Sequence, residues 1–141
     1  MLLPKKVKYR KWHTMRRNPK RAFVETRGTD LSFGSFGLKA ISAGRVRSNQ
    51  IEAARKVLAR SAGKLGKIWI RIFPDMPYTG KPAEVPMGAG KGDLEGYQFQ
   101  VRPGRVIFEI DGMESMTARE ALRKAGTKLP LKTAVVTRRE G

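Results

Sequence analysis

Positive charge is the feature that most restricts what this sequence can fold into. Its 141 residues include 30 Lys and Arg but only 12 Asp and Glu, so the formal net charge is +18. Repulsion of this size opposes a compact chain unless a polyanion neutralises it, which makes a nucleic acid the first expected partner. Because 40% of the residues are apolar, the chain can still build one modest hydrophobic core.

Several residue types are scarce, and their scarcity excludes classes of function. There is no cysteine, hence no disulfide, thiolate nucleophile or cysteine-ligated metal. The single histidine, His13, argues against a zinc site and against histidine-based acid–base catalysis. No apolar run approaches the ~20 residues of a membrane span, and the first residues do not resemble a signal peptide. We expect a soluble protein of the cytoplasm or an organelle matrix, with no metal or cofactor.

Residues 1–30 differ in composition from the remainder. They hold 10 basic residues and two acids with little apolar periodicity, so we predict a basic N-terminal arm that orders against RNA. Aromatic rings among the cations favour RNA contact over a disordered solubilising tail, because rings stack on bases while cations meet phosphates. The candidate contacts in this arm are Lys5, Lys6, Lys8, Tyr9, Arg10, Lys11, Trp12, His13, Arg16 and Arg17.

Two stretches have helical periodicity. The first runs from Ser48, the expected N-cap, to Lys64, and its apolar face comprises Ile51, Ala54, Leu58, Ala62 and Leu65. The other face of this helix is basic and carries the candidate RNA contacts Arg55, Arg60 and Lys64. The second helix is expected to begin at a capping box, Thr117 with Glu120, and to end at Gly126. Its core-facing residues are Ala118, Ala121, Leu122 and Ala125.

Apolar alternation predicts strands over residues 31–38, 67–73, 97–101, 105–110 and 132–138. Pro103 and Gly104 are expected to join the third and fourth of these as a hairpin. Trp69 lies in the second strand, where a core position is favoured over a stacking platform; Arg71 in the same strand is a candidate RNA contact. The element order predicts one α+β domain over residues 31–141, in which a mixed sheet packs against two helices in two layers.

Residues 74–96 are rich in Pro and Gly and are predicted to be a loop, with its glycine-rich part at 80–96. A phosphate-binding P-loop is excluded because Val85 takes the place of its first glycine and Gly92 follows Lys91. We favour a loop whose bare backbone approaches RNA, with a flexible hairpin tip as the alternative. Its candidate contacts are Met87, Gly88, Gly90, Lys91 and Gly92.

The acidic residues give no indication of catalysis. Asp93 with Glu95, and Glu109 with Asp111, lack a nucleophile or metal partner at a meaningful spacing, and carboxylates among many cations usually form salt bridges. A non-enzymatic RNA-binding protein is therefore the main interpretation. The alternatives are a free RNA-binding or RNA-chaperone protein, a small RNA-processing enzyme and a cationic membrane-surface protein.

Several segments together resemble one family. Residues 63–75 and 87–92 are similar to the two signature segments of the bacterial large-subunit ribosomal protein L16 family, whose archaeal and eukaryotic counterpart is L10e. Residues 1–5, 8–11, 33–38, 50–55 and 128–133 are also similar to that family, in the same order. The loop departs from the pattern at two positions: Pro86 stands in place of the family's arginine, and Ala89 stands where the family often has a lysine.

The resemblance implies an α+β sandwich with a hammerhead-like β extension and a structural role in the large ribosomal subunit. It implies binding to 23S rRNA near the 5S rRNA and the central protuberance, contact with neighbouring large-subunit proteins, and entry late in subunit assembly. It also implies that the basic arm and the glycine-rich loop help to form the aminoacyl-tRNA site, where the loop faces rRNA and tRNA. The expected location is a cytoplasmic ribosome, or an organellar one, with no homo-oligomer and no membrane contact.

Overall fold

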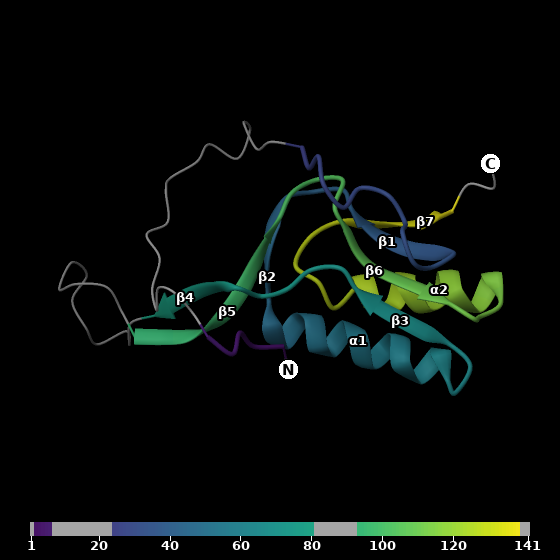
Figure 1. Cartoon of the computed structure of the whole chain (residues 1–141), viewed down its shortest axis with the longest axis horizontal. Coiled ribbons are helices and arrows are strands. Elements are labelled where there is room, and N and C mark those ends of the chain that lie inside the picture. The colour runs from purple at the N-terminus through teal and green to yellow at the C-terminus, as the bar shows by residue number, and fades with distance from the viewer. Residues whose placement is uncertain (1, 7–23, 81–92, 139–141) are drawn as a thin grey trace.

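The computed structural model describes residues 2–6, 24–80 and 93–138. Within these segments the chain forms two helices and seven strands (Figure 1). In chain order they are β1 (Phe36–Ala40), β2 (Gly44–Arg47), α1 (Ser48–Ala62), β3 (Lys67–Ile70), β4 (Met76–Gly80), β5 (Asp93–Val101), β6 (Val106–Asp111), α2 (Ser115–Gly126) and β7 (Thr133–Thr137).

The strands form two sheets. One has the order β3-β6-β1-β7 and the other the order β2-β5-β4, and all the pairings are antiparallel. Both helices pack against the four-stranded sheet, whereas β4 and β5 extend away from the helices (Figure 1). The predicted α+β class with two helices is confirmed, but two antiparallel sheets replace the single mixed sheet that was expected.

The hydrophobic core lies between the helices and the four-stranded sheet. Alternate residues of β1 and β6 point toward the helices, and small side chains on α2 allow the two layers to approach closely. The predicted core faces of both helices are confirmed, except at the end of α1: Ala62 is only half-buried, and Leu65 is 86% exposed because α1 ends at Ala62. Fully buried members of this core include Leu38, Ile51, Ala54, Leu58, Phe108, Ile110, Ala118 and Leu122.

Both helices begin differently from the prediction. The N-cap of α1 is Arg47, whose backbone N–H donates to the side-chain oxygen of Gln50 at 2.9 Å. Ser48 is the first helical residue instead, and its hydroxyl donates to the carbonyl of Leu2 at 2.6 Å. Helix α2 begins two residues before Thr117, with Glu114 as N-cap, so the predicted capping box is wrong.

The predicted hairpin around Pro103 and Gly104 is also wrong. Strand β5 pairs with β2 and β4, while β6 pairs with β1 and β3, so the turn carries the chain from one sheet into the other. The backbone N–H of Gly104 donates to the carbonyl of Ala40 at 2.8 Å, which fixes this crossing against the end of β1. Alternation identified both strands but contains no information about which strand each one pairs with.

The Pro- and Gly-rich stretch contains a strand that the sequence did not predict. Within the expected loop, β4 pairs with the first half of β5, so that Tyr78 lies opposite Gly96 and Thr79 opposite Leu94. Strand β2 was also missed, because four residues with two arginines do not resemble a core strand. Residues 81–92, which include the candidate contacts Met87, Gly88, Gly90, Lys91 and Gly92, lie outside the described residues.

Candidate nucleic-acid interface

The described cations divide into those with internal partners and those at the surface. Arg71 and Arg105 belong to the first group. One guanidinium nitrogen of Arg105 donates to the carbonyl of Arg71 at 3.0 Å and another to the carbonyl of Arg27 at 3.3 Å. The guanidinium of Arg105 also lies 5.5 Å from the centre of the Phe99 ring. Arg105 therefore connects residues 24–28 to both sheets.

Arg71 is held by Glu109, a carboxylate that is completely buried on β6. Glu109 alternates with Phe108 and Ile110, which face the helices, so its side chain points to the opposite side of the sheet. There one carboxylate oxygen accepts the backbone N–H groups of Ser32, Phe33 and Gly34 at 2.7, 2.9 and 3.1 Å. The other oxygen forms the ion pair with Arg71.

These bonds determine the ionisation of Glu109. Burial alone would raise its pKa, but the hydrogen bonds from Phe33, Gly34, Arg71 and Ser32 outweigh it, so the pKa lies below the ordinary value. Because the amides of residues 32–34 point at this carboxylate, they cannot join a ladder. The predicted strand over residues 31–38 therefore starts only at Phe36.

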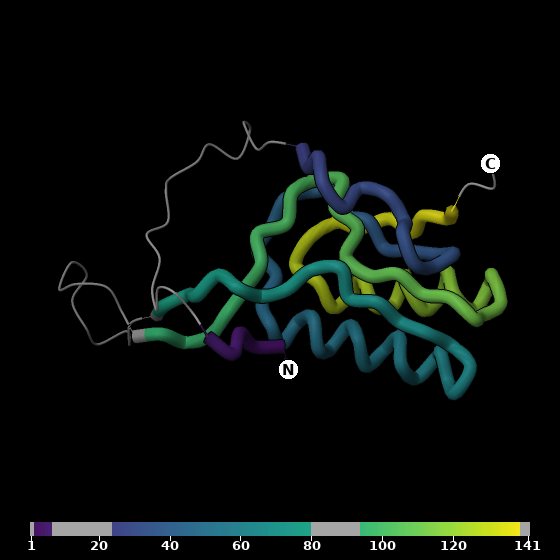
Figure 2. Tube along the Cα trace, in the orientation of Figure 1, coloured from purple at the N-terminus to yellow at the C-terminus, as the bar shows by residue number. Residues whose placement is uncertain are grey.

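Residues 24–35 follow the outer side of the four-stranded sheet along β6 (Figure 2). The N–H of Val106 donates to the carbonyl of Gly28 at 2.7 Å, and the N–H of Ser35 donates to the carbonyl of Ile110 at 3.1 Å. The ring of Phe33 stacks on Trp69 with 5.9 Å between ring centres and 18° between planes. Trp69 lies opposite Glu109, on the side of the sheet away from the helices, and is partly buried. It is therefore a packing residue beneath Phe33 and not the member of the hydrophobic core that the sequence favoured.

Among the candidate RNA contacts that the structure describes, Arg71 is the one held in an internal ion pair. Its side chain is only 19% exposed, and its guanidinium lies 5.0 Å from the centre of the Phe33 ring. Sequence reasoning missed this role, although a lone glutamate inside the apolar run of β6 was a signal that a cation must lie opposite it.

The surface cations gather first on the two helices. We define the helical basic surface as Lys56, Arg60 and Lys64, on α1 and just after its end, with Arg119, Arg123 and Lys124 on α2; all six are exposed. Two carboxylates on these helices are already paired, Glu52 with Arg55 and Glu120 with Arg123. The hydrogen bond from Arg55 lowers the pKa of Glu52, and the one from Arg123 lowers that of Glu120. Both carboxylates therefore stay ionised at neutral pH. Because they are outnumbered by the six cations of the helical basic surface, this surface still carries an excess of positive charge.

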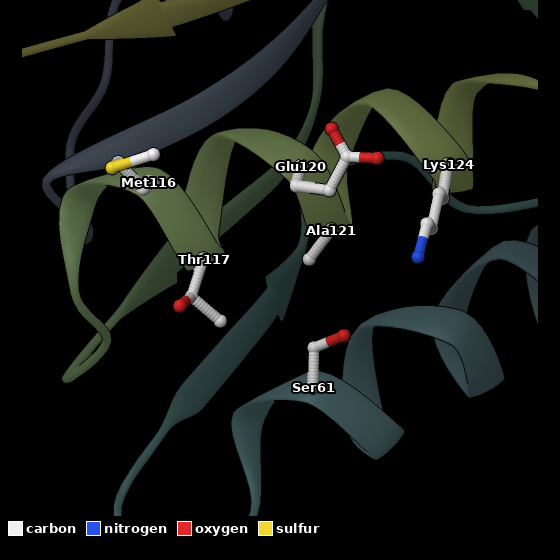
Figure 3. Close-up of a pocket in the computed structure, with 6 residues that line it drawn as sticks. All are labelled: Ser61, Met116, Thr117, Glu120, Ala121 and Lys124. Atoms are coloured by element: carbon white, nitrogen blue, oxygen red, sulfur yellow. The ribbon is translucent and has the colours of Figure 1, made fainter.

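A shallow hollow of about 320 Å³ lies between the two helices (Figure 3). It is lined by Ser61, Met116, Thr117, Glu120, Ala121 and Lys124. Among these lining residues the one carboxylate is that of Glu120, and it accepts hydrogen bonds from Arg123 at 2.6 and 3.1 Å, so it is not a free acid. The hollow has no nucleophile–base pair and resembles a gap between surface side chains rather than an active site.

A second group of cations lies where the N-terminal residues meet β2. The bond from Ser48 to Leu2 holds residues 2–6 at the start of α1, and Lys5 and Lys6 are exposed there. Arg45 and Arg47 on β2 are exposed as well. The other candidate contacts of the arm, Lys8, Tyr9, Arg10, Lys11, Trp12, His13, Arg16 and Arg17, lie outside the described residues.

In residues 2–6, 24–80 and 93–138, no three carboxylate or histidine side chains come together as metal ligands would. Neither of the helices found in these segments is long and apolar enough to cross a membrane.

A family model and two individual proteins place the chain in the same family. The sequence model of the family described as Ribosomal protein L16p/L10e matches residues 4–136. The chain is 53% identical over 138 residues to the large ribosomal subunit protein uL16 of Rhodopseudomonas palustris, covering 98% of each protein. It is 51% identical, with the same coverage, to the protein of that name from Afipia carboxidovorans.

Proposed function

Because this chain belongs to the ribosomal protein L16p/L10e family, a family of structural and not enzymatic components, we propose that it is a constituent of the large ribosomal subunit and binds its rRNA through exposed cations. The observation that carries this proposal is identity above 50% along 98% of the chain to proteins named as large-subunit components. Both relatives are bacterial, which favours a bacterial ribosome in the cytoplasm.

The finer part of the proposal concerns the partners. We infer that the chain binds 23S rRNA near the 5S rRNA and helps to form the aminoacyl-tRNA site, with the glycine-rich loop facing tRNA. Entry late in subunit assembly and contact with neighbouring proteins belong to the same proposal. Pro86 and Ala89 leave the loop tip with two fewer cations than the family pattern, so its approach to RNA would depend on the backbone and on Lys91.

The physical basis of binding would be counterion release. Each Lys or Arg that meets a phosphate displaces condensed cations, and about ten such contacts give a log–log dependence of affinity on salt of about −7 to −9. The helical basic surface, with Lys5 and Lys6, supplies exposed cations in the described part of the chain. Specificity would come from RNA shape and 2′-hydroxyl contacts, since the deep groove of paired RNA is closed to side chains.

The test is sedimentation of the tagged full-length chain through sucrose gradients of its native lysate, at low and moderate salt. Co-migration with the large subunit at both salt concentrations is the expected result. Migration near the top of the gradient at both concentrations would contradict the proposal and favour a free RNA-binding protein. A tagged small-subunit protein in the same lysate controls for non-specific adherence of basic proteins to large subunits.

A further inference from the structure

The face of the three-stranded sheet that carries Arg47 contains an arrangement that the family assignment does not explain. In antiparallel strands, residues directly opposite one another point to the same side. Arg45 lies opposite Gln100, Arg47 opposite Gln98 and Tyr78 opposite Gly96, so these side chains share one face. The reverse face carries Val46, Phe99 and Val101, which pack in or against the core. The arginine face is therefore the one turned away from the core: Arg45, Arg47 and Gln100 on it are exposed, whereas Gln98 and Met76 are buried.

Arg47 and Tyr78 meet across the central strand of this sheet. Arg47 is on β2 and Tyr78 on β4, with β5 between them, yet the guanidinium of Arg47 lies 4.6 Å from the centre of the Tyr78 ring. The path across β5 is open because residue 96 is a glycine: a Cβ there would come within 2.9 Å of the Tyr78 hydroxyl oxygen. The Tyr78 ring thus lies across the bare backbone of Gly96 and supports the arginine above it.

A guanidinium held in this way is preorganised to bind an anionic ligand. Arginine has five N–H donors in a planar fork, and stacking on an aromatic ring fixes the plane while leaving the edge free to donate. Where the register is uninterrupted, over residues 44–47, 76–78 and 96–101, none of the side chains on this face is acidic: they are Arg45, Arg47, Met76, Tyr78, Gln98 and Gln100. Arg47 and Arg45 are both exposed, and two residues of strand place their Cα atoms about 6.6 Å apart.

The surroundings extend this positive face toward the N-terminal residues. The hydroxyl of Ser48, the residue after Arg47, donates to the carbonyl of Leu2. Lys5 and Lys6 are three and four residues after Leu2 in the chain. At the reach of an extended chain, both lysines lie within about 14 Å of Leu2. Four exposed cations therefore gather around the junction of β2 and α1.

We propose that this face is an RNA contact in which Arg47, held by Tyr78, donates to the phosphate backbone and Arg45 meets a neighbouring phosphate. The inference rests on the proposed function, which supplies the RNA, and assigns to it residues that sequence reasoning did not single out. Arg47 is the contact residue, and Tyr78 is a positioning residue that acts through it. An RNA is favoured over a protein partner because the face offers donors and positive charge but few exposed apolar groups.

The test measures binding of the full-length chain to protein-free rRNA from large subunits, with rRNA from small subunits as competitor, over a range of salt. We expect Arg47→Gln to weaken binding about tenfold and to reduce the salt slope by about 0.7–0.9, the loss of one phosphate contact. Tyr78→Leu should weaken binding about threefold with an unchanged slope, because it removes no charge. Arg138→Gln removes one exposed cation directly after β7, a strand that lies at the end of the molecule away from β4 (Figure 1). It is the matched control and should change binding less than twofold.

A double variant separates positioning from a general structural effect. If Tyr78 acts through Arg47, Tyr78→Leu should cost nothing further in the Arg47→Gln background. A loss that persists there would refute the positioning role, and thermal unfolding of each variant shows whether the fold is intact.

The remaining outcomes separate the two proposals. Equal effects of Arg47→Gln and Arg138→Gln would refute the RNA contact and leave the ribosomal function standing. If the unsubstituted chain prefers small-subunit rRNA or neither RNA, the proposed function fails. If Arg47→Gln weakens association with whole subunits but leaves binding to naked rRNA unchanged, the face contacts a protein and the RNA assignment is wrong.

Discussion

Glu109 holds the segment before β1 onto the sheet through three backbone hydrogen bonds and an ion pair with Arg71. Glu109→Gln preserves the shape of the side chain and leaves one oxygen to accept the three backbone N–H groups of residues 32–34. It removes the negative charge and presents an N–H₂ group to the Arg71 guanidinium, so the ion pair is lost. The variant thus tests the charge of Glu109 rather than its packing.

The expected cost follows from the burial of the two partners. Removing one member of a buried ion pair costs about 3–5 kcal/mol, because the other charge is left without compensation. Glu109 is fully buried but Arg71 is 19% exposed, so water can partly solvate the remaining guanidinium. We therefore expect the free energy of unfolding to fall by about 2–3 kcal/mol, which corresponds to a decrease in melting temperature of about 6–10 °C.

The loss should depend on pH. The pKa of Glu109 in the folded chain lies below its ordinary value of 4.5, so the stabilisation by its charge is fully present above about pH 4.5 and disappears as the pH falls through the folded pKa. Glu109→Gln does not titrate at this position. The difference in stability between the two proteins should be constant from pH 5 to 8 and should shrink below pH 4.5.

The assay is urea unfolding followed by circular dichroism, with Glu120→Gln as the matched control. Both substitutions raise the net charge by one, but Glu120 is an exposed helix residue paired with Arg123, so the control should leave stability unchanged within error. Equal stabilities for Glu109→Gln and Glu120→Gln, or a difference that does not shrink in acid, would refute the role assigned to Glu109.

Three further substitutions test the packing. A Cβ on Gly34 would lie 2.5 Å from the backbone carbonyl oxygen of Ile110, so Gly34→Ala should displace the segment bound to Glu109 and lower the free energy of unfolding by about 1–3 kcal/mol; an unchanged urea midpoint would contradict this contact. Leu122→Ala removes a fully buried core side chain and should cost about 2–5 kcal/mol in the same assay, so a loss below 1 kcal/mol would show that α2 is not packed as described. Phe33→Leu removes the ring stacked on Trp69 and should shift the fluorescence of Trp69 to the red in a Trp12→Phe background, at a cost of about 0.5–1.5 kcal/mol; an unchanged spectrum would place Phe33 elsewhere.

Local patterns predicted most elements of this fold. The helical spacing of Ile51, Ala54 and Leu58 identified α1 and its buried face, and the run of β6 identified the most buried strand. These predictions are correct because the periodicity of a helix or a strand determines on which face each side chain lies. Strand pairing does not follow in this way, which is why β5 and β6 were wrongly joined as a hairpin and why β4 was concealed among prolines and glycines.

The assignment of cations needed the structure. Sequence alone treated Arg71 as a surface charge equal to Arg60, whereas the fold places Arg71 against a buried carboxylate and Arg60 in solvent. It also passed over Arg47, because the tyrosine that supports this arginine is 31 residues away in the chain and lies on β4, on the other side of the central strand β5. Charge counts predict that a chain binds a polyanion, but only tertiary contacts distinguish the cations that stabilise the fold from those free to bind.

Cross-linking of native large subunits, followed by mass spectrometry of peptide–nucleotide adducts, tests the central claim most directly. Peptides of this chain should be present in purified large subunits and should carry RNA adducts at the helical basic surface and around residues 45–47. Adducts should be absent from the peptide around Arg105, whose guanidinium is held by backbone carbonyls. Absence of the chain from large subunits, or adducts on Arg105 with none on the helices, would contradict the account.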